Sequence, residues 1–189
     1  MSYVMTMIAC VSLSESLWIF YLFFVIHEIE EWNIARFEKR VFAGLPATHN
    51  DRNARAWIGV VCMIGFAWCA AATLPSSPRV AAYIILPAIA FSAANALQHV
   101  YWSLRFRSVA PGLVSAVVLM LPSTAYLTFL IIGYGLVSPW YAAGLSVLAL
   151  MMLAGTVKSG DSAPSIIPAI YGIGDRASKL AHSIKMLTR

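Results

Sequence analysis

The chain has 189 residues, of which 60% are hydrophobic and only 11% are charged, and its mean hydropathy is +0.77. Soluble globular domains are about 45–50% apolar and about 25% charged, so the composition excludes such a domain and predicts an integral all-α membrane protein. The net charge of +5 comes from basic residues between and after the apolar segments, and we therefore expect no nucleic-acid-binding surface.

Five apolar segments have roughly the 20 residues that a helix needs to span a bilayer. In chain order they cover about 13–36, 57–74, 80–104, 112–132 and 140–157. We expect them to form one polytopic helix bundle over residues 1–157 that holds an intramembrane polar site. We expect residues 158–189 to form a flexible linker and a cytoplasmic amphipathic tail helix.

Lys and Arg residues alternate between the two ends of these segments. The four connections carry five, one, two and none of them in order, and the tail carries five, so alternate sides hold twelve and one. Basic residues favour the cytoplasmic side, which predicts an external N-terminus and a cytoplasmic C-terminus. The apolar stripe of the tail would then lie on the cytoplasmic leaflet or against a partner helix.

Four residues outside the apolar segments carry smaller expectations. His49 stands among turn residues of the first connection and His182 stands on the tail, so we expect both histidines to be solvated. Gly172 and Gly174 fall in the early part of the tail helix, where we expect them to interrupt it.

The first apolar segment ends in the sequence HEIEE, residues 27–31. Each helical residue advances about 100°, so Glu31 lies about +40° and Glu30 about −60° from His27, and the three share a face. Glu28 lies at about +100°, where we expect it to meet a loop, a headgroup or a basic residue.

A second polar cluster lies in the third apolar segment, where Asn95, Gln98 and His99 share one helix face at spacings of three and four. His27 precedes the basic end of its segment by nine residues and His99 precedes its own by six. At ~1.5 Å per residue the two clusters lie within roughly 5 Å of the same depth. We therefore expect them to meet in the cytoplasmic half of the bundle.

Ionisable groups inside a span cost about 2.5–3.5 kcal/mol each, so a compensating interaction is expected. Two imidazoles and two carboxylates supply N and O ligands for one divalent cation, zinc or non-haem iron. The predicted ligands are His27, Glu30, Glu31 and His99, the two glutamates are also candidate catalytic groups, and Asn95 and Gln98 would orient ligands or substrate. The leading hypothesis is a metal-dependent hydrolase or oxidase acting on a lipid or lipophilic small molecule near the cytoplasmic leaflet.

The same residues allow other interpretations. The polar groups could form only structural ion pairs with Arg36, Arg105 or Arg107 at the helix ends. The protein could also be a transporter or a small subunit that uses the cluster to bind a membrane partner or a second copy of itself.

Two family resemblances rest on these residues. The stretch from His27 to Glu31, followed by NALQHVYWSLRFRSVAPG with Asn95 and His99, resembles the HXXEE family of small bacterial integral membrane proteins. That resemblance implies a multi-pass protein of the bacterial inner membrane, but it implies no established activity.

The adjacent glutamates are also similar to the pattern E-E-x-x-x-R followed by F-x-x-x-H of glutamate-dependent intramembrane proteases. Arg36 comes one residue late for this pattern, and Phe91 stands eight residues before His99. In this alternative Glu30 or Glu31 is the general base for water, and His99 with Asn95 stabilises the oxyanion.

Overall fold

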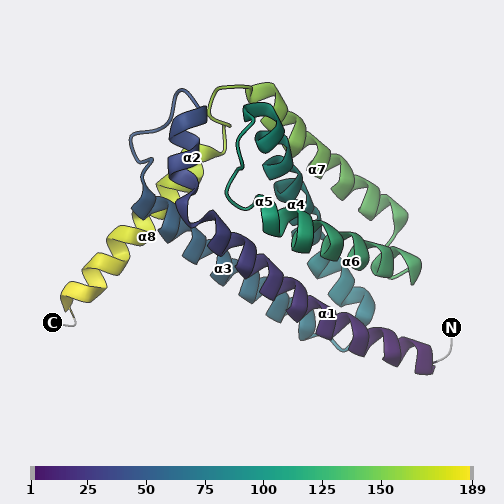
Figure 1. The fold of residues 1–189 in the computed structure, drawn as a ribbon. Helices are drawn as coiled ribbons and strands as arrows, with labels where there is room; N and C mark the ends of the chain where they lie inside the picture. The colour runs from purple at the N-terminus through teal and green to yellow at the C-terminus, as the bar shows by residue number, and fades with distance from the viewer. Residues whose placement is uncertain (1–2, 188–189) are drawn as a thin grey trace.

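The computed structural model describes residues 3–187, with the side chains of residues 13–186. The described chain is all-helical, which confirms the predicted fold class (Figure 1). Its elements are α1 (Tyr3–Glu30), the 3₁₀ turn η1 (Glu31–Asn33), α2 (Ile34–Val41), α3 (Asp51–Thr73), α4 (Pro78–Phe106), α5 (Leu113–Ser115), the π-helix η2 (Ala116–Met120), α6 (Leu121–Gly133), α7 (Pro139–Ser159) and α8 (Ile167–Leu187).

Four helical segments in the described part of the chain are long and apolar enough to cross a membrane. They are α3, α4, the joined segment Leu113–Gly133 and α7, and they match the second to fifth predicted spans. The first predicted span corresponds to α1, which is 28 residues long but is not among the four. The helices thus support a membrane protein, whereas the count of five spans and the orientation stay predictions.

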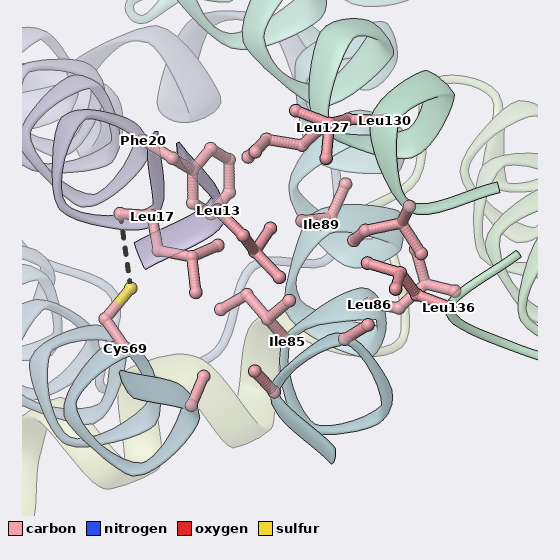
Figure 2. Packing of buried hydrophobic residues seen from close by; sticks show 14 of the residues in the cluster. Leu13, Leu17, Phe20, Cys69, Ile85, Leu86, Ile89, Leu127, Leu130 and Leu136 are labelled. Carbon is pink, nitrogen blue, oxygen red and sulfur yellow. Dashed lines mark hydrogen bonds between the residues drawn. The ribbon is translucent and has the colours of Figure 1, made fainter. Parts of the chain in front are cut away.

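The main hydrophobic core lies among α1, α3, α4 and α6 (Figure 2). Leu13, Leu17 and Phe20 form the buried stripe of α1, at the spacings of three and four that place residues on one helix face. Cys69 of α3 packs beside this stripe and donates a weak hydrogen bond from Sγ to the Leu17 carbonyl over 3.7 Å. The opposite face of α1 exposes large apolar residues, as a lipid-facing helix does.

A second core joins the end of the bundle that carries the basic residues. Phe37 and Phe42 pack there with Trp102 of α4 and with Ile167 and Tyr171 of α8. The segment before α8 is bound to the same end, because Ala43 N–H donates to the Asp161 carbonyl and Ala163 N–H donates to the Ala43 carbonyl, each over 2.9 Å. This end is where α2 and α8 meet in Figure 1.

The tail helix packs along the first turns of α3, but through another face than its apolar stripe. Ile173, Leu180 and Ile184 of that stripe stay exposed, so the packing decides neither for the membrane surface nor for a partner helix. Arg52 Nη2 donates to the Ser178 carbonyl over 3.1 Å, and Ser178 Oγ donates to Asn53 Oδ1 over 3.1 Å. The expected interruption by glycine is wrong, because α8 runs unbroken through Gly172 and Gly174. A Cβ on Gly174 would lie 2.0 Å from the Asn53 carbonyl oxygen, so this glycine permits the close approach of the two helices.

The prediction of a solvated His49 is also wrong. Its side chain is only 7% exposed, its Nε2 lies 2.9 Å from Glu38 Oε2, and its ring centre lies 4.4 Å from that of Tyr171. The turn residues around His49 suggested solvent, but its partners come from α2 and α8. His182 is exposed, as expected.

Candidate functional site

Three of the predicted ligands converge in the structure, and we call His27, Glu31 and His99 the triad. Glu31 Oε1 lies 3.1 Å from His27 Nε2 and 2.7 Å from His99 Nε2. One ligand atom from each residue lies within 4.8 Å of the others. Both histidines are 1% exposed, and their rings meet edge to face at a centroid distance of 5.0 Å.

The fold brings these residues together from two elements. His27 and Glu31 stand four residues apart across the junction of α1 and η1, so they lie on one face about one turn apart. His99 comes from α4, which packs against α1. The two polar clusters of the first and third apolar segments therefore face each other at one depth.

Hydrogen bonds around His27 indicate which of its two ring nitrogens carries the proton and which carries the lone pair. Asn95 Nδ2 donates to His27 Nε2 over 3.1 Å. On the other side, Ser115 Oγ donates to the Gly112 carbonyl, so it accepts from His27 Nδ1 over 2.9 Å. Nε2 therefore carries the lone pair, which a metal ion would take in place of the hydrogen bond from Asn95.

Glu30 lies apart from the triad, although it was a predicted ligand. Its carboxylate accepts the backbone N–H of Val114 over 3.1 Å and that of Ser115 over 2.7 Å. These amides open the helical segment that follows Gly112, so Glu30 fixes that segment to the end of α1. Since Ser115 also contacts His27, Glu30 positions the triad indirectly.

Gly112 packs directly against the three side chains of the triad. A Cβ at this position would lie 3.0 Å from Glu31 Cγ, 3.0 Å from His27 Cε1 and 3.1 Å from His99 Cε1. Its φ of +87° is also in the left-handed region that favours glycine. Both constraints require glycine here, because no other residue fits against all three side chains.

Three buried polar side-chain atoms in the described part of the chain have no hydrogen bond. They are Glu31 Oε1, His99 Nδ1 and Trp102 Nε1. The two imidazole nitrogens are close to Glu31 Oε1, but neither contact has the orientation of a hydrogen bond. Buried polar atoms are normally paired, so this cluster has the character of a site for a cation or a polar ligand.

The triad opens on a cavity of about 530 Å³ between α1, α3, α4, α7 and α8. Asn95 and Gln98 line it, although no hydrogen bond joins Gln98 to the triad among the described residues. Glu28 also lines the cavity and is only 6% exposed, and in the described part of the chain it forms no ion pair with a basic residue. The expectation that it meets a basic residue is therefore wrong. Apolar and aromatic side chains supply most of the remaining wall.

A second buried polar cluster, Glu38, His49 and Tyr171, lies beside the cavity. Tyr171 Oη donates a short hydrogen bond to Glu38 Oε2, the oxygen that also contacts His49. Burial raises the pKa of Glu38 to about 7, lowers the pKa of His49 and raises the pKa of Tyr171. One sequence signal could have found Glu38, since it stands seven residues, or two helical turns, after Glu31.

Comparison with known protein families gives one match. The matching model describes proteins of unknown function with an HXXEE motif, and it covers residues 18–127. The chain belongs to the HXXEE family. Comparisons with curated proteins and with solved structures find no match.

The matched range contains the whole triad together with Glu30, Asn95, Gly112 and Ser115. In the HXXEE motif of this chain, the histidine and the last glutamate form the site, while the first glutamate binds the backbone that supports it. Tyr171 lies outside the matched range, so the α2–α8 cluster is completed by a residue that the family model does not include.

Proposed function

We propose that this HXXEE protein is a membrane-embedded, metal-dependent enzyme, a hydrolase or an oxidase, that holds one divalent cation at His27, Glu31 and His99. The observation that carries the proposal is the convergence of two imidazole nitrogens on a buried carboxylate oxygen without hydrogen-bond geometry. In a membrane interior such a cluster needs a proton or a cation to compensate it.

The spacing of the ligand atoms fits a metal ion. Ligands at 2.0–2.1 Å in tetrahedral geometry lie about 3.3 Å from one another. The two contacts of Glu31 Oε1, at 3.1 and 2.7 Å, are shorter than that separation by about 0.2 and 0.6 Å, so the side chains would have to move apart only slightly to admit the ion. Two histidines and one carboxylate are the protein ligands of many catalytic zinc sites and of non-haem iron oxygenases. Three protein ligands would leave a position open for water or substrate.

The cation would supply a Lewis acid that activates water or, if it is iron, dioxygen. The remaining residues prepare the site. Ser115 fixes the ring of His27 through Nδ1, and Glu30 fixes the backbone that carries Ser115. Asn95, which lies beside Nε2, would then orient the substrate. Gly112 lets its backbone pack closely against all three triad side chains.

A lipid or lipophilic small molecule is the natural substrate, because the cavity lies within helices that are apolar enough to span a membrane. The distribution of basic residues would place this cavity near the cytoplasmic leaflet of a bacterial inner membrane. We therefore propose the cytoplasmic leaflet as the side from which the substrate enters.

The direct test is metal binding by purified protein. Wild type, reconstituted with zinc or ferrous iron and freed of excess metal, should hold close to one ion per chain by elemental analysis. His27→Ala and His99→Ala should lose it. His182→Ala, which removes an exposed histidine from the tail, is the matched control and should bind like wild type.

Wild type that binds neither metal after reconstitution would overturn the proposal. Enzyme activity that survives complete chelation would instead support the protease-like mechanism, with a glutamate as general base. Retention of metal by His99→Ala would show that the ion is bound elsewhere.

A further inference from the structure

The cavity beside the triad is lined by acidic groups without a basic partner. Its lining contains the carboxyl groups of Glu28, Glu31 and Glu38, whereas no Lys or Arg lines it in the described part of the chain. A buried carboxyl group without a partner is costly in an apolar surrounding, and a cationic ligand would compensate it.

One of the three carboxyl groups has no partner. Glu31 contacts the two histidines, and Glu38 contacts Tyr171 and His49. Glu28 has no hydrogen bond or ion pair with the described part of the chain, although it is more than nine-tenths buried and lines the cavity. The side chain is therefore available to a ligand.

Aromatic side chains elsewhere in the lining of the cavity suit a cationic group. Trp57, Trp102 and Tyr171 line the same cavity, and aromatic faces attract ammonium ions, by about 2 kcal/mol or more when the pair is desolvated. Trp102 also presents the indole N–H that has no acceptor among the described residues. A ligand with a cationic head and a nearby hydrogen-bond acceptor would satisfy both groups.

The rim of the cavity suits an alkyl chain. Phe91 of α4 and Met151 of α7 line the cavity and are exposed, and both helices are candidate membrane spans. Exposed residues on such helices face lipid, so the cavity opens toward the bilayer at this rim. An amphiphile could place its head beside Glu28 and its tail along Phe91 and Met151.

We infer that the substrate of this site is a cationic amphiphile, a lipid or lipophilic amine with an ammonium head that pairs with Glu28. The inference rests on the proposed function only in taking the cavity beside the triad as the substrate site. Glu28 thereby becomes the residue that determines specificity, while the triad holds the metal.

Binding of three probes with the same twelve-carbon chain tests the inference. Dodecylamine, dodecanol and dodecanoate are titrated calorimetrically into wild-type protein in an uncharged detergent. We expect dodecylamine to bind at least tenfold more tightly than the other two. Glu28→Gln should weaken dodecylamine binding to the level of dodecanol and leave dodecanol binding unchanged. Glu15→Gln, which alters an exposed carboxylate on the same helix, should bind all three probes like wild type.

Equal binding of the three probes by wild type overturns the inference, and this comparison stands even if Glu28→Gln fails to fold. A preference for dodecylamine that persists in Glu28→Gln overturns the role of Glu28. Metal content measured on the same samples separates this result from the proposed function. Metal binding without a preference for the amine would support the metal proposal alone. Preference for the amine without metal binding would support the amine-binding pocket alone.

Discussion

The two adjacent glutamates of the HXXEE motif have different surroundings. Glu31 contacts both histidines of the triad, whereas Glu30 accepts the backbone N–H groups of Val114 and Ser115. The two side chains have different partners at the point where α1 ends, at Glu30, and the 3₁₀ turn η1 begins, at Glu31. One motif therefore supplies both a member of the triad and the group that positions it.

Substituting each glutamate by glutamine tests this division. Glu31→Gln should abolish metal binding, because it removes the only carboxylate of the triad. Glu30→Gln retains one acceptor oxygen for the backbone amides and should lower metal affinity by roughly 10–100-fold, as is typical for residues that support a ligand. Titration of each purified variant with zinc measures the difference. Equal loss in both variants would indicate that Glu30 is also a ligand.

Gly112 allows a second test at the level of one residue. In Gly112→Ala the new methyl group would meet all three triad side chains at about 3 Å, so metal affinity should fall. Gly135→Ala is the matched control, because Gly135 also has a positive φ, +61°, but open space around its Cα. The control should show only the backbone strain of about 1–2 kcal/mol in thermal unfolding, with unchanged metal affinity.

The Glu38 cluster predicts a pH-dependent stability. Because burial raises the pKa of Glu38 from 4.5 to about 7, the folded protein binds this proton more tightly than the unfolded chain. The stabilisation is present below pH 4.5 and is lost as pH rises toward about 7, by roughly 3 kcal/mol at most. The lowered pKa of His49 acts in the opposite direction, because its stabilisation is lost as pH falls below about 6.5.

Comparison with Glu38→Gln isolates the contribution of Glu38, since His49 is present in both proteins. Between pH 5 and pH 7.5 wild type should lose stability relative to the variant, by several degrees at roughly 2–4 °C per kcal/mol. Thermal unfolding in detergent at four pH values measures this difference. A difference that does not change with pH would contradict the raised pKa.

The limits of sequence-based prediction are clear at this scale. Helical periodicity alone predicted that His27 and Glu31 share one helix face. The number of residues between each histidine and the basic end of its segment predicted that His99 lies at the same depth. Periodicity also predicted that Glu30 lies on that face. In the structure Glu30 binds the amides of Val114 and Ser115, more than eighty residues away, and helical periodicity gives no information on such distant contacts. The partner of Glu38 on α8 is 133 residues distant, so only the tertiary fold reveals it.

At the level of elements, the apolar segments predicted the four candidate spans within a few residues. The sequence did not predict that the fourth segment is divided into α5, the π-helix η2 and α6. Such π-helical turns are frequent at functional sites, and Met120 at the end of η2 lines the cavity. The packing of α8 on α3 was also not predicted, because it uses Gly174 and Ser178 rather than the apolar stripe of the tail.

The contact between α8 and α3 can be tested at its closest point. Gly174→Ala would place a methyl group 2.0 Å from the Asn53 carbonyl oxygen, so α8 would have to shift, with an expected destabilisation of about 1–3 kcal/mol. Gly172→Ala is the control, because nothing lies within 4 Å of its added Cβ. Alanine favours a helix over glycine by about 1 kcal/mol, so the control should be neutral or stabilised.

Thermal unfolding and the rate of trypsin cleavage within α8 measure both variants. Cleavage at exposed Lys179 should be faster in Gly174→Ala than in wild type or Gly172→Ala. Equal stability of the two variants would show that α8 does not pack on α3 through Gly174.

At the scale of the whole molecule, the basic residues gather at one end of the bundle. Arg105 at the end of α4 pairs with Asp161 before α8 over 2.8 Å, and Arg36 pairs with Asp51 at the start of α3 over 3.1 Å. Arg79, near the start of α4, belongs to the opposite end. The folded chain thus places the basic residues of the first and third connections at the end opposite Arg79, as the sequence predicts.

This asymmetry predicts the orientation, which single-cysteine labelling in a cysteine-free background can test. Ser77→Cys lies in the turn between α3 and α4, and a membrane-impermeant maleimide should label it in intact cells. Ser183→Cys lies on exposed α8 and should react only after permeabilisation, because the predicted orientation places the basic end in the cytoplasm. An N-terminal epitope tag that is accessible from outside would add α1 as the fifth span. The reverse labelling pattern would place the triad near the external leaflet, and the substrate would then have to reach it from that side.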